Sequence, residues 1–267
     1  MRDDPTTILA RHRVFWSREP ADRPILSVQA YTPLQPLALD LPAAYLQPEQ
    51  LRVEDVLRAN QAMLDSGGIL QGDLFLVGEP YQPVPWMEAI VGCPIRVSAQ
   101  TGSFRAEPVA DSPDAIRHVD LDERWLAKLL EYTQALVEHS RGVYPVVQAL
   151  MRGPIDILAA LVGDEVACMS LVTNAVQTRR LLSQLTDAFV EVVRRQMAMI
   201  PPYHGGYVNW YGLWCPGVPV RLQADNGALL SPQTYRHFPL PLDDRIARSF
   251  DYAPDFCSLT TEFSSVS

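Results

Sequence analysis

Residues 218–242, which read VPVRLQADNGALLSPQTYRHFPLPL, constrain the fold of this chain more than any other stretch. Apolar residues alternate with other residues over 218–222, a pattern that predicts a short strand. Turn-forming residues follow at 224–227 and end that strand. Ser231 before Pro232 then predicts the N-cap and the first turn of a helix. The stretch therefore predicts a strand, a loop and a helix, which is the βα unit of an α/β protein.

The loop of this unit carries a carboxylate, Asp225. In α/β enzymes, catalytic residues usually lie in the loops at the carboxyl ends of the strands. Asp225 is therefore the first candidate for a catalytic residue. The alternative is that its side chain only caps the turn, because Asp-Asn-Gly is an ordinary turn sequence.

The alternation of strands and helices extends along most of the chain. Strands are predicted at residues 25–28, 74–77, 143–150, 205–209 and 218–222. Helices are predicted at residues 6–16, 53–64, 121–139, 155–162 and 174–200, and from Pro232 with a break at Pro239 and Pro241; residues 95–117 are predicted to add a small hairpin. Parallel strands joined by crossover helices satisfy this order, either as an open sheet or as a (β/α)8 barrel. Neither GxGxxG nor GxxxxGK[ST] occurs, which disfavours the open sheets that bind nucleotides.

Charge and cysteine content narrow the class of protein. The formal net charge of −9 disfavours binding to nucleic acid. No apolar run is long enough for a signal peptide or a membrane span, so no membrane partner is expected. The 4 cysteines are scattered without a CxxC pair, which predicts reduced thiols and no self-contained metal site. We therefore expect a cytoplasmic protein whose substrate is a small molecule.

Three segments together resemble the uroporphyrinogen decarboxylase superfamily, which also contains the corrinoid (cobalamin)-dependent methyltransferases. They are residues 152–163 with their Gly-Pro pair, the helix that follows Asn174, and residues 225–241, where a proline-opened helix ends in Phe-Pro-Leu-Pro. The resemblance covers most of residues 10–252. It implies a (β/α)8 TIM barrel with a cleft at the carboxyl ends of the strands, which would hold a tetrapyrrole-like (porphyrin-type) or methylated small molecule.

The resemblance also implies site residues. Asp73 falls where the decarboxylases hold the aspartate that binds pyrrole N–H groups, and Asp225 falls on the cleft wall, so these two are the predicted catalytic residues. The predicted substrate-binding residues are Trp86, Gln148, His204, Tyr207, Asn209 and Tyr211. Aromatic residues after a strand can line an apolar cleft, but they pack equally well in a core. Asp73 could be a solvated loop residue, and His204, beside prolines and glycines, is typical of a loop histidine.

The sequence departs from the decarboxylases where substrate carboxylates bind. The decarboxylases carry an Arg-Gln-Ala-Gly-Arg-Tyr segment after the first strand, whereas residues 27–33 here read SVQAYTP and contain no arginine. The active-site tyrosine of the Gly-Pro helix is replaced by Ala160. A polycarboxylate without cationic partners would leave unpaired charges in a cleft, which is costly. These departures therefore disfavour the lyase reaction of the family, the decarboxylation of uroporphyrinogen, for this chain.

The methyltransferase branch implies zinc, bound by a His-x-Cys pair and a distant cysteine, together with a corrinoid. That pair normally lies on the strand after the Phe-x-x-Pro helix, whereas residues 253–267 are rich in serine and threonine and show no strand or helix period. We therefore expect a truncated barrel domain at residues 1–252, incomplete at its C-terminus, followed by an irregular tail at 253–267. An unclosed barrel leaves a strand edge that favours pairing with another chain, for example in a homodimer.

These observations leave three functions open. The leading one is a divergent enzyme of the superfamily, either a lyase or a methyltransferase, that binds its substrate in the barrel cleft. The second is a zinc- and corrinoid-dependent methyltransferase, with a corrinoid protein as partner, whose metal site is missing from this chain. The third is a vestigial protein without catalytic activity. No cofactor follows from the residues themselves.

Overall fold

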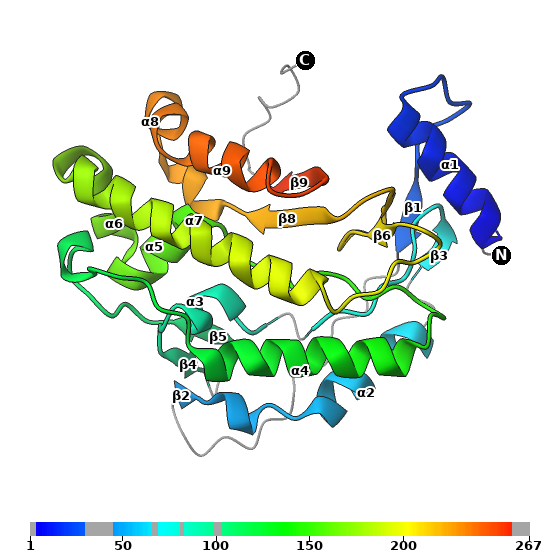
Figure 1. The fold of residues 1–267 in the computed structure, drawn as a ribbon, viewed down its shortest axis with the longest axis horizontal. Helices are drawn as coiled ribbons and strands as arrows, with labels where there is room; N and C mark the ends of the chain where they lie inside the picture. Colours follow the sequence, from blue (N-terminus) through cyan, green and yellow to red (C-terminus); the bar gives the residue numbers. More distant parts are fainter. Residues whose placement is uncertain (1–3, 30–44, 66–68, 81–82, 99–102, 258–267) are drawn as a thin grey trace.

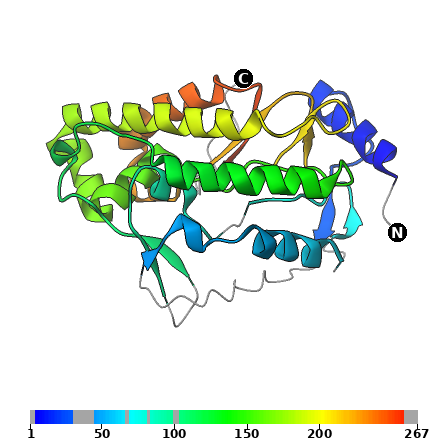
Figure 2. The same cartoon turned by 60° about the horizontal axis from the view of Figure 1, so that its bottom comes forward.

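The computed structural model of the protein describes residues 4–29, 45–65, 69–80, 83–98 and 103–257. These residues form a mixed α/β fold (Figure 1). Helices α2 (Val53–Asp65), α4 (Glu123–Ser140) and α7 (Ala175–Met197) lie side by side along the molecule (Figure 2). None of the helices in the described ranges is both long and apolar enough to span a bilayer.

Parallel segments organise the fold. Within the described residues, the parallel order is residues 73–79, residues 143–152, strand β8 (Pro219–Gln223) and strand β9 (Tyr252–Cys257). Because these segments are parallel, their carboxyl ends meet at one end of the molecule, toward which the arrowhead of β8 points in Figure 1. Helix α1 (Pro5–Ser17) lies at the opposite end, beside the amino ends of the segments (Figure 1).

The first two parallel segments are not regular strands, although strands are predicted at residues 74–77 and 143–150. Single bridges, Gly78 to Val146 and Arg152 to Gln223, replace a continuous ladder. Other partners take backbone groups that a ladder would use, because the N–H of Phe75 donates to Gly212 O and the N–H of Ala149 donates to the side chain of Gln196. A complete eight-stranded barrel is therefore not seen in the described part of the chain, whose other sheets are small.

The amino-terminal half adds small antiparallel sheets at the margins. Strand β1 (Ser27–Gln29) pairs with β3 (Ile69–Gly72). Strand β2 (Tyr45–Leu46) pairs with β4 (Ile95–Val97), and β4 pairs with β5 (Phe104–Ala106). The pairing of β4 with β5 confirms the hairpin predicted within residues 95–117. Short 3-10 helices lie at Pro48–Gln50 (η1) and Pro113–Ala115 (η2).

The remaining helices are α3 (Trp86–Ile90) in the amino-terminal half and, in the carboxyl-terminal half, α5 (Pro154–Val162), α6 (Asp164–Thr173), α8 (Pro232–His237), α9 (Pro239–Ala247) and the 3-10 helix η3 (Asp225–Leu229). Strand β6 (Tyr207–Val208) folds back on β7 (Trp214–Cys215) as an antiparallel hairpin. The strand predicted at residues 205–209 is therefore not a parallel member of the sheet.

Most predicted helices are confirmed, and their local signals explain their limits. Ser231 Oγ accepts a hydrogen bond from the backbone N–H of Thr234 at 3.1 Å, so the N-cap predicted for α8 is present. The prolines predicted to break this helix separate α8 from α9 at Phe238. Helix α6 was not predicted. The tail predicted to be irregular from residue 253 instead continues β9 as far as Cys257, and residues 258–267 lie outside the described residues.

Alternate side chains of the parallel segments point to opposite sides and enter different apolar clusters. Val146, Val220 and Leu222 belong to the larger cluster, which they share with helices α4, α5 and α7. Val147 and Phe75 belong to a smaller cluster with residues of α1 and of the β6–β7 hairpin. The sheet therefore has an outer face covered by helices and an inner face on which α1 and the hairpin pack.

Candidate functional site

Arg221 lies in the middle of β8, between two residues that point to the helices. Its side chain therefore points to the inner face, where it is only 7% exposed. The guanidinium lies 4.2 Å from the ring centre of Trp210 and 5.1 Å from that of Tyr211. Among the described residues, its Nε and Nη1 atoms have no hydrogen-bond partner. A buried cation with free donors favours binding of an anion, since unsatisfied buried groups are costly.

Glu79 lies at the carboxyl end of the first parallel segment and faces the same cluster. The side chain of Asn60 fixes its backbone, with Nδ2 donating to Glu79 O at 3.0 Å and Oδ1 accepting from Glu79 N at 3.0 Å. The indole N–H of Trp210 donates to Glu79 Oε2. Burial raises the pKa of Glu79 to about 7, although the Trp210 hydrogen bond and the charge of Arg221 oppose this rise.

The loop that carries Trp210 and Tyr211 is held rigidly at both sides. Asn209 Oδ1 accepts hydrogen bonds from the backbone N–H groups of Tyr211 (3.0 Å) and Leu213 (2.9 Å). Gly212 adopts a φ of 87°, which favours glycine, and its carbonyl accepts from the N–H of Phe75 at 2.9 Å. We call Glu79, Gln148, Trp210, Tyr211 and Arg221 the Arg221 cluster.

A second group of buried carboxyls lies at the same end of the sheet. Glu88 on α3 is fully buried, and neither of its carboxyl oxygens has a hydrogen-bond partner among the described residues. The Nη1 atom of half-exposed Arg152 lies 3.4 Å from Glu88 Oε1. Burial raises the pKa of Glu88, and the charge of Arg152 lowers it less. Asp156 on α5 is also buried, which raises its pKa to about 6.

The two predicted catalytic residues are not brought together. Asp73 begins the first parallel segment and is buried, with Arg11, Arg23 and the N–H of Leu26 all donating to its carboxylate. These partners, Arg23 first, hold the pKa of Asp73 well below its usual range. Asp225 instead follows β8 at the opposite end, with its side chain exposed.

The carboxylate of Asp225 accepts from Gln223 Nε2 at 2.5 Å. The buried carboxylate of Asp156 binds the loop itself, through the N–H groups of Asp225 (2.9 Å) and Asn226 (2.8 Å). The loop therefore has an ordered backbone and leaves the Asp225 side chain accessible. Its catalytic role stays a prediction, as does that of Asp73.

The predicted substrate-binding residues divide into two sets. Gln148, Asn209 and Tyr211 belong to the Arg221 cluster or support it directly. Trp86 is fully buried in the core, edge-to-face with Trp125 and Tyr132. His204 lies in an exposed turn with a φ of 51°, and Tyr207 packs against the larger apolar cluster. These three are not gathered with the Arg221 cluster, and their predicted role is untested.

Glu79, Trp210 and Arg221 were not among the predicted site residues. No clear signal in the sequence marked Arg221, because it occupies a position between the alternating apolar residues of 218–222, where a half-buried strand normally exposes a polar side chain. Glu79 is the first charged residue after the apolar run at 74–77, which is the position where barrel enzymes place functional groups. Only the fold could reveal that these side chains meet.

The zinc ligands implied by the methyltransferase branch have no counterpart in the described residues. No group of three or more His, Cys, Asp or Glu residues is arranged there to hold a metal ion. Cys93 is buried in the large apolar cluster, and burial raises the pKa of its thiol to about 12. Such a thiol is a poor metal ligand, since metals bind the thiolate. The described residues therefore do not fit the zinc site that the methyltransferase branch implies.

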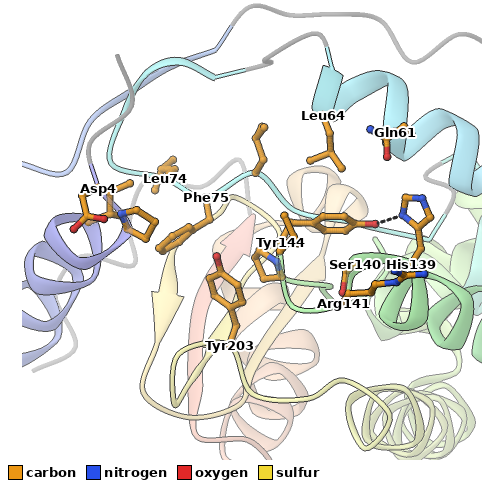
Figure 3. Close-up of a pocket in the computed structure, with 15 residues that line it drawn as sticks. Asp4, Gln61, Leu64, Leu74, Phe75, His139, Ser140, Arg141, Tyr144 and Tyr203 are labelled. Carbon is orange, nitrogen blue, oxygen red and sulfur yellow. Dashed lines mark hydrogen bonds between the residues drawn. The ribbon is translucent and has the colours of Figure 1, made fainter.

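A cavity of about 790 Å³ lies at the other end of the molecule, near α1 (Figure 3). It is lined by the amino ends of the first two parallel segments and by the end of α4. Because barrel enzymes carry their chemistry at the carboxyl ends of the strands, the Arg221 cluster is the better candidate for the main site.

Comparison with known proteins gives a structural match only. No protein-family model matches the sequence, and no curated protein has significant sequence similarity to it. Among solved structures, the fold is similar to that of a methyltransferase from Methanosarcina mazei, with a TM-score of 0.63 and 15% sequence identity. The match covers 92% of this chain and 67% of the methyltransferase. At this identity the similarity establishes the fold alone.

Proposed function

We propose that this chain is a divergent barrel enzyme of the uroporphyrinogen decarboxylase superfamily that binds a small anionic substrate on Arg221. The observation that carries the proposal is the burial of the Arg221 guanidinium with two nitrogens that lack hydrogen-bond partners among the described residues. A carboxylate or sulfonate would supply the missing acceptors, and a planar guanidinium binds such groups with paired hydrogen bonds. The fold similarity to a methyltransferase supports the choice of superfamily.

The neighbouring groups suit a substrate with one anionic end. Trp210 and Tyr211 both contact the guanidinium, and Tyr211, at 40% exposure, leads from the cluster to the surface. Glu79 shares the cluster, and its pKa near 7 allows it to exchange a proton with a bound molecule near neutral pH. Arg221 therefore binds and orients the substrate, and Glu79 is the candidate acid or base.

Within the superfamily we favour methyl transfer over decarboxylation. A uroporphyrinogen-like polycarboxylate needs several cations, whereas the buried inner face described here offers Arg221, and Arg152 already lies beside Glu88. A short anionic methyl acceptor needs only one cationic partner. The decarboxylase and the non-catalytic binding protein are the alternatives.

Isothermal titration of the full chain tests the proposal. The probes are thioglycolate as a short anionic thiol, uroporphyrin as a polycarboxylate tetrapyrrole and methylcobalamin as a methylated corrinoid. We expect thioglycolate to bind, and Arg221→Gln to weaken it about tenfold or more, the loss expected for a charge-assisted hydrogen bond. Arg221→Lys keeps the charge but loses the planar guanidinium, so its affinity for thioglycolate should lie between those of the wild type and Arg221→Gln. Arg105→Gln, on the exposed residue of β5, is the matched control.

The outcomes separate the alternatives. Tight binding of uroporphyrin that depends on Arg221 would favour the decarboxylase. Binding of thioglycolate that is indifferent to Arg221 would refute the proposal. Formation of S-methyl thioglycolate and cob(I)alamin from methylcobalamin and the thiolate of thioglycolate would support methyl transfer, whereas Arg221-dependent binding without any product would favour the non-catalytic protein.

A further inference from the structure

The cavity near α1, which we call the amino-end pocket, has the size of a small-molecule site. Its volume of about 790 Å³ lies within the roughly 300–1,000 Å³ that such sites occupy. Figure 3 shows that its wall comes from α1, α2, the end of α4 and the first two parallel segments. Nothing in the proposed function uses this pocket.

The pocket is separate from the Arg221 cluster. Phe75 lines the pocket and Glu79 belongs to the cluster, on the same segment. Tyr144 and Gln148 are related in the same way on the next segment. Four residues of extended chain span about 13 Å at about 3.3 Å per residue. A single short ligand does not reach from one to the other.

One part of the pocket wall is apolar and aromatic. Phe75 and Tyr203 meet edge-to-face, with ring centres 5.4 Å apart, and Ile8 and Leu64 extend the apolar surface on either side. Aromatic and branched ligands bury their carbon surface well on such walls. This part of the pocket therefore favours an apolar body.

The part of the wall at the end of α4 is polar and cationic. Arg141 lines it, and its guanidinium forms no ion pair with another residue in the described part of the chain. The ring Nδ1 of His139 and the hydroxyl of Tyr144 form a hydrogen bond of 2.8 Å beside it (Figure 3). The acid on the wall, Asp4, is instead the residue that immediately precedes α1. A ligand anion would therefore be attracted to the α4 side and repelled from the α1 side.

We propose that the amino-end pocket binds a small amphipathic anion, with an aromatic or branched apolar body against Phe75 and Tyr203 and one carboxylate or sulfonate at Arg141. This would be a second ligand site, at the opposite end of the sheet from the Arg221 cluster. It does not depend on the function proposed for that cluster.

Fluorescence titration of the full chain with 8-anilinonaphthalene-1-sulfonate, an aromatic sulfonate, tests the proposal. We expect one saturable site. Arg141→Gln should weaken it about tenfold or more, as loss of a charge-assisted contact does, and Arg141→Lys should retain most of the affinity. The uncharged analogue N-phenyl-1-naphthylamine should bind at least about tenfold more weakly. Leu64→Trp, which fills the pocket, should abolish binding; if it unfolds the chain, Gln61→Trp fills it from the exposed rim.

Two controls make the result decisive. Arg105→Gln removes an exposed arginine elsewhere and should leave binding unchanged. Arg221→Gln should also leave it unchanged, which separates this site from the proposed substrate site. Dye binding that persists in both Arg141→Gln and the filled-pocket variants would overturn the proposal, as would binding lost only in Arg221→Gln. Thermal melts of every variant exclude dye binding to unfolded chain.

Discussion

The side chain of Gln148 forms hydrogen bonds with both the backbone N–H and the backbone C=O of Arg221, a residue of β8. It replaces the hydrogen bonds that a neighbouring strand would make. Its Oε1 accepts from Arg221 N at 2.9 Å, and its Nε2 donates to Arg221 O at 2.7 Å. Both residues are buried, so the two bonds are shielded from water. This contact sets the position of the Arg221 backbone and therefore the point from which its guanidinium reaches the aromatic rings.

Gln148→Leu should destabilise the protein by about 2–4 kcal/mol, because it leaves two buried backbone groups without partners. Urea denaturation measures the free energy of unfolding. Gln134→Leu, on the exposed side of α4, is the matched control and should change it by less than about 0.5 kcal/mol. Gln148→Glu keeps an acceptor for Arg221 N but places a carboxylate oxygen against Arg221 O, so it should also destabilise the protein at neutral pH. Equal effects at the two glutamines would contradict the role given to Gln148.

Glu79→Gln should stabilise the protein at pH 8 but not at pH 4. The folded-state pKa of Glu79 is raised to about 7 by burial, whereas the unfolded chain ionises near 4.5. The folded state therefore holds a proton that the unfolded state has lost, and its stability falls as pH rises through this window, by roughly 1.4 kcal/mol per pKa unit. Glutamine at position 79 does not ionise, so this loss of stability disappears, and its side-chain oxygen can still accept the hydrogen bond from Trp210. Thermal melts across pH measure the effect.

The ionisation of Glu79 should also affect how tightly Arg221 binds the proposed anionic ligand. Ionised Glu79 competes with an anion for the guanidinium, so thioglycolate should bind more weakly as pH rises through about 7. In Glu79→Gln this pH dependence should disappear. A wild-type affinity that stays constant between pH 6 and 8 would exclude Glu79 as a neighbour of the bound anion.

Asp73→Asn should cost about 3 kcal/mol at neutral pH, since it removes the buried carboxylate charge that Arg11 and Arg23 share. The folded-state pKa of Asp73 is lowered, so its contribution is present above the pKa of the unfolded chain, near 4, and is lost as pH falls. The difference between wild type and variant should therefore shrink below about pH 4. Asp120→Asn, on an exposed residue, serves as the control. A stable Asp73→Asn variant that no longer binds ligand would instead support the predicted catalytic role.

Local signals in the sequence predicted local structure well. Ser231 before Pro232 predicted a cap that is present, and Pro239 predicted a helix break that occurs at Phe238. Helix α6 was missed because its apolar residues are not confined to one face; Met169 and Val172 are exposed.

Long-range contacts could not be predicted in the same way. Asp73 lies 62 residues from Arg11 and 50 from Arg23, and no local pattern joins them. Arg221 and Glu79 meet only because parallel segments bring their carboxyl ends together. Asp225 lies at the same end of the sheet as the Arg221 cluster and Asp73 at the opposite end, so the sequence alone predicted neither a single end nor the residues that gather on the inner face.

Gly212→Ala should destabilise the protein more than Gly92→Ala, and the comparison isolates a steric contact. Both glycines have a positive φ, 87° and 97°, so alanine costs about 1–2 kcal/mol at either position. A Cβ at Gly212 would lie 2.2 Å from the carbonyl oxygen of Phe75, whereas one at Gly92 meets nothing within 4 Å. The backbone at 212 must therefore shift, at a further cost of roughly 1–3 kcal/mol.

The shift would also move the loop that presents Trp210 and Tyr211 to Arg221, because the Gly212 carbonyl accepts from Phe75 N. Gly212→Ala should therefore weaken thioglycolate binding as well as lower the free energy of unfolding, while Gly92→Ala should lower only the latter. Urea denaturation and isothermal titration of the two variants measure both quantities. If Gly212→Ala retained wild-type affinity, Arg221 would not depend on this loop for its position, and the anion site would be set by β8 and Gln148 alone.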